Sequence, residues 1–513
     1  METRPFPLSI GGGKPVPEEA PKSERFVVDF DGPSDPMNAQ NWSSRKKVLA
    51  GAITCYTCLC SSFASSIFST ATPALSQHFH VSEEVTTLAT ALFVLGYVFG
   101  PLVWGPLSEL KGRKLPIVIG MFGFTVFAAG TAAGKDLQTV LLCRFFNGVM
   151  GSSPLTVGAG IFADMYDHAH RGGAIAIFAM CIFLGPCLAP FIGGFTVMSY
   201  LGWRWTGYWC LIMGALSFCL CCLLPETYTP TLLTMKAASL RKKTGNWAIH
   251  SPQEEVEVSL SDIFTKYFAR PIIMLAVEPV LFLVSFYMSF VYGILYLFFE
   301  SYPLVFMGVH RFNPGESGLP FFALGLGVIM SVVVVILTMP SYNRKLAANG
   351  GRPVAEWRLP LVMAGGISFT IGLFWFGWTG DSAGIHWIVP TLSGLFTGFG
   401  FISIFMPLFN YIIDSYLMYA ASAIAANTLM RSAFGACFPM FANYMYQGLG
   451  IGLATTVCGC VAAAMIPVPV VFYFYGGKLR ERSKFAPTPP KPMPVKRDEE
   501  SASTDENEES KEE

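Results

Sequence analysis

The sequence predicts an all-α membrane protein with twelve transmembrane helices in two six-helix bundles and with both termini in the cytoplasm. Of its 513 residues, 52% are hydrophobic and 13% are charged, about half the charged share of an average soluble domain. Predominantly apolar runs recur along the chain, and each is long enough to cross a hydrocarbon core of about 30 Å as a helix. Lys and Arg gather in alternate loops, the pattern that marks the cytoplasmic side of a membrane.

The N-terminal segment, residues 1–47, is rich in Pro, Gly and charge and contains no apolar run of the kind that a secretory signal peptide needs. It ends in the basic triplet Arg45-Lys46-Lys47, directly before the first apolar run. By the positive-inside rule this triplet keeps the segment in the cytoplasm. We therefore expect a disordered cytoplasmic arm.

The predicted N-terminal bundle covers residues 48–224 and the C-terminal bundle covers 272–475, separated by a hydrophilic cytoplasmic loop at 225–271. The expected spans of the first bundle are 48–70, 85–107, 115–134, 137–163, 172–198 and 205–224. Those of the second are 272–299, 317–339, 359–378, 386–413, 418–446 and 450–475. The tail, 476–513, is Pro-rich and then acidic, which is typical of disordered sequence.

Basic residues test this topology. The loops on the proposed cytoplasmic side carry clusters of Lys and Arg, whereas near the membrane on the proposed outside we find Lys135, Arg204 and Arg311. Such a bias indicates an even number of spans with both ends in the cytoplasm.

Arg144 places a guanidinium inside the fourth apolar run. Burying an Arg there costs at least about 2.5–3.5 kcal/mol, so an intramembrane charge is a functional hypothesis by default. The alternative is an Arg that extends to the membrane surface, because residue 144 lies within roughly two turns of the helix start.

The fifth run contains Gly185, Pro190, Gly193 and Gly194. Proline bends a helix, and glycine lets a neighbouring helix approach closely. Packing alone explains such a segment, and a conformational role is the second interpretation.

Two pairs of residues in the second bundle are spaced to share a helix face. Tyr292 and Tyr296 stand at i and i+4, as do Asn427 and Arg431. Aromatic surfaces suit planar or apolar ligands, and Asn427 and Arg431 offer polar contacts, so these four residues are substrate-binding candidates. Helix packing is the alternative interpretation for both pairs.

The loop Gly105-Pro-Leu-Ser-Glu109-Leu-Lys-Gly112-Arg113-Lys114 resembles the loop motif between helices 2 and 3 of the major facilitator superfamily. Glu109 replaces the usual Asp, and Leu110 replaces the first Arg. Gly105, Glu109, Gly112 and Arg113, with Asp164, would then form a conformational motif.

Arg144 matches the helix-4 arginine that this family uses in proton coupling. Gly185, Pro190, Gly193 and Gly194 resemble the helix-5 motif of drug:proton antiporters, with Ala189 in place of one glycine.

Further stretches resemble the fungal twelve-span drug:proton antiporters: Asp35-Pro36, Asn41-Trp42-Ser43, Trp203-Arg204-Trp205, Pro225-Glu226-Thr227-Tyr228, Tyr292-Gly293 and Asn427 with Arg431. The resemblance implies a proton-coupled exporter of amphipathic or aromatic small molecules, such as drugs, toxins or secondary metabolites, that works by alternating access.

Proton coupling needs a titrating group. The first span has no Asp or Glu, so the candidates are Glu278 and Glu300 in the seventh, while Asp164 and Asp414 are expected to pair with loop cations. We take Arg144 with Glu278 as the hypothesis.

Other functions remain as alternatives: a facilitator or importer of a nutrient, and a membrane sensor that does not transport. The sequence contains no Gly-x-x-x-x-Gly-Lys-[Ser/Thr] phosphate loop, so we expect no direct use of ATP. We expect no enzyme activity, because an enzyme needs a grouped nucleophile or metal-ligand set, and His78 and His80 lack Asp or Cys ligands beside them. No cofactor, metal or nucleic acid is expected. The expected partners are the substrate, protons and the lipid bilayer, with the protein acting as a monomer in the plasma membrane or, as the alternative, the vacuolar membrane.

Overall fold

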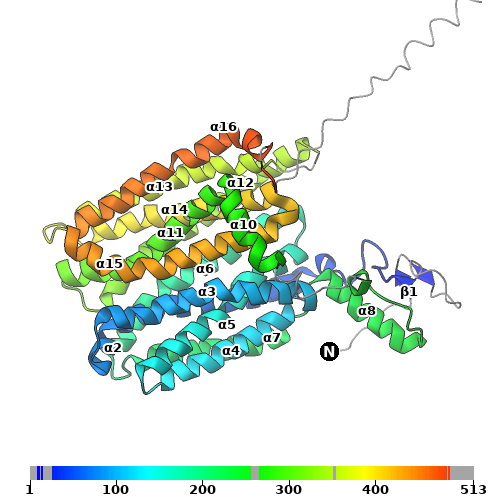
Figure 1. The fold of residues 1–513 in the computed structure, drawn as a ribbon, viewed down its shortest axis with the longest axis horizontal. Helices are drawn as coiled ribbons and strands as arrows, with labels where there is room; N and C mark the ends of the chain where they lie inside the picture. The colour runs from blue at the N-terminus through cyan, green and yellow to red at the C-terminus, as the bar shows by residue number, and fades with distance from the viewer. Residues whose placement is uncertain are drawn as a thin grey trace, which may run out of the picture.

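The computed structural model describes residues 9–11, 13–15, 26–255, 265–350, 354–481 and 483–485. Long helices lie side by side along the longest axis of the molecule (Figure 1). The first half contains α1 (Ser44–Ser66), η3 (Ile67–Ala71), α2 (Thr72–Phe79), α3 (Glu83–Lys111), α4 (Lys114–Ala133), α5 (Leu137–Met165), α6 (His168–Met198) and α7 (Arg204–Leu223).

The second half begins after the central loop. It contains α10 (Arg270–Val277), α11 (Pro279–Pro303), η6 (Leu304–Val309), η7 (Glu316–Gly318), α12 (Pro320–Ala348), η8 (Ala355–Arg358), α13 (Leu359–Gly380), α14 (Ile388–Tyr416), η9 (Leu417–Tyr419), α15 (Ala420–Met465) and α16 (Pro467–Glu481). One cluster of buried apolar side chains lies wholly in the first half, and the other covers the second half but also includes Val94 of α3 and four residues of α6. The second cluster therefore extends across the boundary between the halves.

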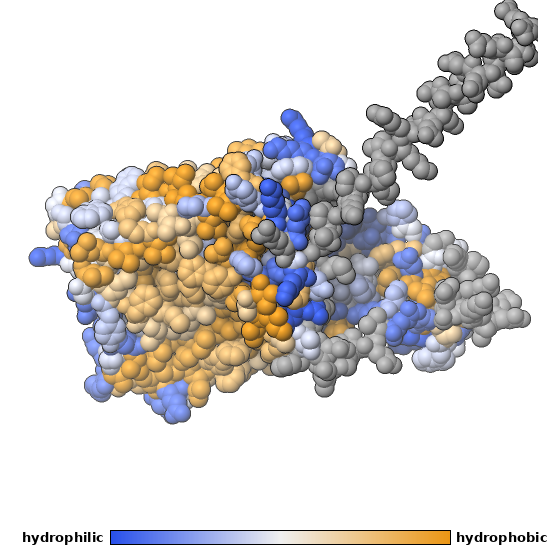
Figure 2. Space-filling model, turned by 45° about the horizontal axis from the view of Figure 1, so that its top comes forward, coloured by the Kyte–Doolittle hydropathy of each residue, from blue (hydrophilic) through white to orange (hydrophobic). Residues whose placement is uncertain are grey.

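Ten helical stretches of the described residues are long and apolar enough to cross a membrane. Apolar side chains cover the flank of the bundle, and hydrophilic ones gather toward its ends (Figure 2). The expected all-α membrane fold is confirmed. The number of stretches is below the predicted twelve for two reasons. The helix α5, whose polar residues include Arg144, is not among the ten, and residues 420–481 count as one stretch.

Two local breaks follow from glycine and proline. Gly450 interrupts α15 with a φ of 77°, a conformation that glycine adopts without steric cost. Pro279 separates α10 from α11, where the sequence predicts one helix over 272–299. Glu278 before it is extended, at φ −101° and ψ 99°, because a residue that precedes proline is disfavoured in the α region.

One end of the bundle carries a small packed unit that contains α8 (Thr229–Thr244) and η4 (Pro252–Glu255) of the central loop, and we call this end the α8 end (Figure 1). Segment 26–43, with η2 (Ala39–Asn41), lies at the same end, and strands β1 (Ser9–Gly11) and β2 (Lys14–Pro15) pair antiparallel. The buried side chains are Ile10, Phe26, Val28, Leu233, Ala237, Leu240 and Ile249.

A buried lysine joins the N-terminal segment to α8. Lys236 Nζ lies 2.8 Å from the Asp29 carbonyl oxygen, 3.0 Å from Asp31 Oδ2 and 3.7 Å from Asp35 Oδ2. Within the 1–47 segment, for which the sequence predicts a disordered arm, the structure therefore places residues 26–43 in contact with the central loop. The end of the predicted tail, 486–513, lies outside the described residues.

Candidate functional site

Arg144 is buried in the interior of the first half. Its side chain is 1% exposed, and Nε donates a hydrogen bond of 2.9 Å to the Ala89 carbonyl oxygen of α3. The guanidinium carbon lies 4.4 Å from the ring centre of Phe68 and 4.3 Å from that of Phe93. The side chain thus points inward and does not extend to the membrane surface.

Tyrosine and serine hydroxyls connect the two halves beside Arg144. Within the first half, the hydroxyls of Ser61 and Tyr97 lie 2.8 Å apart. Across the boundary, Tyr296 of α11 donates a 2.9 Å hydrogen bond to Ser65 Oγ of α1. Tyr292 and Tyr296 have hydroxyls 3.3 Å apart, so the predicted pair shares one face and lies at the interface.

Arg431 and Asn427 of α15 lie beside the same face of α11. The Arg431 guanidinium carbon is 4.8 Å from the ring centre of Tyr292 and 5.1 Å from that of Phe405. Asn427 is fully buried, and its Nδ2 donates to Met288 Sδ at 3.4 Å. The four substrate-binding candidates therefore line one region, and in this conformation Tyr292, Tyr296 and Asn427 are buried.

The glycines of α6 permit close contacts with both halves. A Cβ at Gly185 would lie 2.7 Å from the Phe63 backbone nitrogen of α1, and Gly193 would meet the side chains of Thr70 and Ile67. At the opposite end from α8, a Cβ at Gly194 would meet the Pro314 carbonyl and lie 2.9 Å from Gly315 Cα. The family's helix-5 motif lies on α6 in this structure and includes a contact between the halves. Pro190 lies inside the same helix.

At the α8 end, Arg113 joins the loop after α3 to the end of α5. Its Nε lies 3.1 Å from Asp164 Oδ2, and its backbone N–H donates to Glu226 Oε1 at 2.9 Å. Gly112 has a φ of +88°, and a Cβ there would lie 2.6 Å from Glu226 Cδ. The structure therefore requires glycine at 112 and brings Arg113 and Asp164 together.

Glu226 is the partner that the sequence analysis did not assign to this site. It accepts hydrogen bonds from the backbone N–H groups of Arg113, the residue before α4, and Lys114, the first residue of α4. A carboxylate at a helix N-terminus is a stabilising arrangement, and the signal was present in the sequence as Pro225-Glu226-Thr227-Tyr228. Gly105 lies inside α3, and the Glu109 carbonyl accepts from Gln253 Nε2 at 3.1 Å.

The second half repeats the arginine–aspartate pair. Arg358 Nε lies 3.0 Å from Asp414 Oδ2, and Arg358 Nη2 donates to the Tyr342 hydroxyl at 2.9 Å. Arg113 precedes α4 and Arg358 precedes α13, so each arginine stands at the start of an equivalent helix. Both expected pairs of a carboxylate with a loop cation, at Asp164 and Asp414, are present.

The two halves also meet at the α8 end. A Cβ at Gly172 of α6 would lie 2.5 Å from Met339 Cε of α12. Arg171 interacts electrostatically with both Asp164 and Asp414, one carboxylate from each half. Together with the Gly194 contact, these interactions bring the halves together at both ends of the interface.

The structure does not bring Glu278 to Arg144. The Glu278 carboxylate accepts hydrogen bonds from the Ser483 hydroxyl at 2.6 Å, the Lys484 backbone N–H at 2.9 Å and the Tyr416 hydroxyl at 3.3 Å. None of these groups contacts Arg144. Because Glu278 precedes Pro279 at the helix break, it lies at an end of α11, where it binds segment 483–485.

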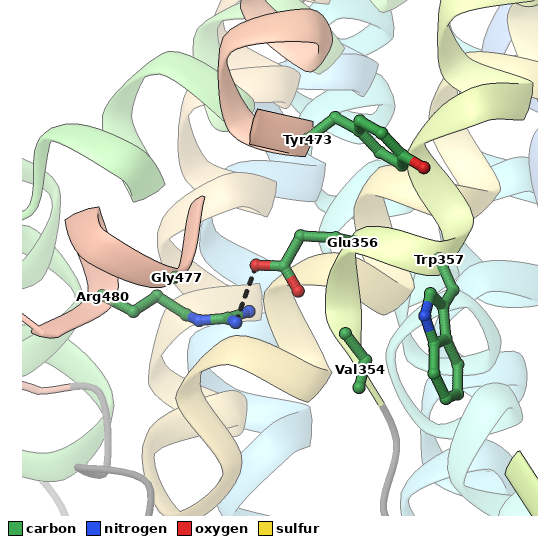
Figure 3. Close-up of a pocket in the computed structure, with 6 residues that line it drawn as sticks. All are labelled: Val354, Glu356, Trp357, Tyr473, Gly477 and Arg480. Atoms are coloured by element: carbon green, nitrogen blue, oxygen red, sulfur yellow. Dashed lines mark ion pairs between the residues drawn. The ribbon is translucent and has the colours of Figure 1, made fainter. Parts of the chain in front are cut away.

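A surface pocket with a cavity volume of about 390 Å³ lies between η8 and α16 (Figure 3). Its lining residues are Val354, Glu356, Trp357, Tyr473, Gly477 and Arg480. Arg480 Nη2 and Glu356 Oε1 form an ion pair of 2.7 Å. None of these residues belongs to the interface between the halves.

The sequence model described as Major Facilitator Superfamily matches residues 54–439. The chain belongs to the Major Facilitator Superfamily. A multidrug transporter of this superfamily from Candida albicans, FLU1, is 46% identical over 452 residues, which are 88% of this chain and 74% of that protein. A Candida glabrata multidrug transporter, TPO1_2, is 46% identical over 86% of this chain and 76% of its own length.

Solved structures of the Major Facilitator Superfamily share the fold. The proton:xylose symporter XylE has a TM-score of 0.61 at 17% identity, with 85% of this chain and 96% of that chain covered. The human organic anion transporter MFSD10 has a TM-score of 0.59 at 16% identity, with 82% and 99% covered. The family match, the apolar helices and the multidrug transporter relatives show that this superfamily protein is a multi-pass membrane protein of a transporter family and not an enzyme.

Proposed function

We propose that this protein exports amphipathic or aromatic small molecules, such as drugs, toxins or secondary metabolites, in exchange for protons. The observation that carries the proposal is the similarity to multidrug transporters, which extends over 88% of the chain at 46% identity. Transporters built from two related halves place their substrate site between the halves. In this chain that region holds Arg144, the tyrosine pair and Arg431.

We further propose twelve spans, with both termini in the cytoplasm. The 29 residues of α5 reach about 44 Å as a helix, enough to cross the hydrocarbon core. Gly450 divides α15, so residues on its two sides form separate spans. The protein would act as a monomer in the plasma membrane, with the vacuolar membrane as the alternative location.

Alternating access would open the interface at one end while the other end stays closed. The ion pairs of Arg113 with Asp164 and of Arg358 with Asp414 would hold the α8 end of each half together during this motion. Glycine and proline in α6, from Gly185 to Gly194, would let the halves close against each other at the opposite end.

Proton dependence is proposed to reside at Arg144. A buried guanidinium without an anionic partner is costly, and an anionic substrate or a change of protonation at a neighbouring group would change that cost. Glu278, the second residue of the sequence-based hypothesis, is tested separately. If Glu278→Gln keeps full protonophore sensitivity, its role is to bind segment 483–485.

The test is retention of a panel of aromatic toxins, dyes and polyamines in yeast cells that lack their own pumps, with and without a protonophore. We expect lower retention of at least one aromatic compound with the wild-type protein, loss of this effect with the protonophore, and loss with Arg144→Ala. Arg204→Gln is the matched control, because Arg204 donates to the Gly134 carbonyl in a loop. If cells with the wild-type protein instead accumulate the compounds, the result would support the alternative function of an importer and contradict the proposal.

A further inference from the structure

Two arginines, Arg144 in the interior of the first half and Arg431 in the second half, lie beside the interface without an acidic partner. Arg144 stands about two turns into α5, and Arg431 stands about three turns into α15. Among the described residues, Arg144 Nη2 and Arg431 Nε are buried and have no hydrogen-bond partner. Two cations therefore keep unused N–H donors in the same region.

No carboxylate faces either guanidinium in the described part of the chain. Cys210, Tyr97 and Tyr296 interact electrostatically with Arg144, and Cys58 and Tyr292 interact with Arg431. In the described helices, the Asp and Glu residues stand in a first or last turn, as Asp164 and Glu300 do, and Glu278 stands in the extended break before α11. The middle of the interface is therefore positively charged.

Flat rings flank both cations. Phe68 and Phe93 lie within 4.4 Å of the Arg144 guanidinium carbon, measured to the ring centres, and Tyr292 and Phe405 lie within 5.1 Å of that of Arg431. The hydroxyls of Tyr292 and Tyr296, which are 3.3 Å apart, add polar groups between the arginines.

We propose that the exported substrates are aromatic anions, such as carboxylates or sulfonates, whose acidic group binds Arg431 and whose ring packs against the neighbouring aromatic side chains. A guanidinium binds a carboxylate or sulfonate through parallel N–H donors, and an anion would use donors that have no protein partner here. This inference names the substrate class and rests on the proposed export function.

The same charge pattern excludes polycations from the site. A polyamine would bring further positive charge beside two arginines in a region that water does not screen, which raises the electrostatic energy.

Exchange of an anion for an incoming proton also moves net positive charge inward, so export would be driven by the membrane potential as well as by the proton gradient.

The experiment uses full-length protein in proteoliposomes with an imposed proton gradient and three probes that share one ring system. They are 1-naphthalenesulfonate, which is anionic, 1-naphthalenesulfonamide, which is neutral, and 1-naphthylmethyl-trimethylammonium, which is cationic. We expect the anion to accumulate about tenfold more than the other two. Arg431→Gln should reduce the ratio of anion to neutral probe to about one, and Arg431→Lys should restore part of it.

The ratio separates recognition from folding, because poorly folded protein lowers the transport of all probes together. Arg204→Gln, outside the interface, should leave the ratio at its wild-type value. Preferential transport of the neutral or cationic probe would overturn the anion inference while the export function stands. If the transport of no probe responds to the proton gradient, both the proposed proton-coupled export and the anion inference fail.

Discussion

Tyr296 donates a 2.9 Å hydrogen bond to Ser65 across the boundary between the two halves. Both side chains are buried, and Ser65 Oγ also donates to the Ser62 carbonyl of its own helix at 2.6 Å. The bond therefore joins α11 to a rigid part of α1. In the alternating access that we propose, this bond breaks when the interface opens.

Removing this bond should destabilise the closed conformation. We expect Tyr296→Phe and Ser65→Ala each to lower the melting temperature of the purified protein. Because both variants remove the same bond, their effects should be non-additive by about 0.5–1.5 kcal/mol. Ser69→Ala is the control, since Ser69 donates to a carbonyl within its own half. If the destabilising effects of Tyr296→Phe and Ser65→Ala add fully in the double variant, the two side chains do not form this hydrogen bond.

Closure at the end opposite α8 should depend on the absence of a side chain at Gly194. A Cβ there would collide with Pro314 and Gly315, so Gly194→Leu is expected to reduce transport at least about tenfold at normal surface abundance. The matched control is Gly448→Leu, because nothing lies within 4 Å of a Cβ at that position. Transport and surface biotinylation of both variants check this, and equal activities would refute the contact.

The ion pair of Arg113 with Asp164 should be recoverable with its charges exchanged. Arg113→Ala or Asp164→Ala leaves a partly buried charge without its partner, at a cost of roughly 1–3 kcal/mol, and we expect transport to fall in both. The exchange Arg113→Asp with Asp164→Arg should restore part of it. The same series at Arg358 and Asp414 provides an independent repeat. An exchange variant no better than either single variant would argue against the pairing.

The α8 unit should be more stable at mildly acidic pH. The Ala248 carbonyl and the Glu255 carboxylate raise the pKa of His250 above its usual value of 6.5. Because the folded-state pKa is the higher one, the stabilisation is fully present below the unfolded pKa and is lost as the pH rises through the folded pKa. Hydrogen exchange at the Val28 amide, which donates to the His250 carbonyl, should therefore accelerate as the pH rises from 6 to 8, beyond the intrinsic pH effect.

His250→Gln is the control for this pH dependence. The variant keeps a polar side chain that does not titrate in this range, so its Val28 protection should follow the intrinsic exchange rate alone. An unchanged pH profile in His250→Gln would show that another group is responsible.

Composition and periodicity were sufficient for the helical fold because a lipid-facing helix needs a long apolar run. Arg144 and the glycines of α6 could be selected from sequence because charge and glycine are conspicuous inside such runs. The tyrosine pair could be selected because its residues are spaced to share a helix face. The spacing within one helix also placed Asn427 and Arg431 on a common face.

Contacts between distant segments could not be read in this way. Glu226 was visible only as part of a motif, and nothing in the sequence indicated that its carboxylate binds the backbone at Arg113. Glu278 looked like a core acid, but the extended backbone before Pro279 places it against Ser483. Lys236 lies in a hydrophilic loop by composition, yet it is buried by residues 26–35.

Proton movement coupled to substrate transport tests the central claim most directly. In proteoliposomes that contain a pH-sensitive dye, addition of a transported aromatic compound to one side should drive protons toward that side, and Arg144→Ala should abolish the signal while the protein remains folded. Substrate transport without any proton movement, or an unchanged proton signal in Arg144→Ala, would contradict the proposed mechanism.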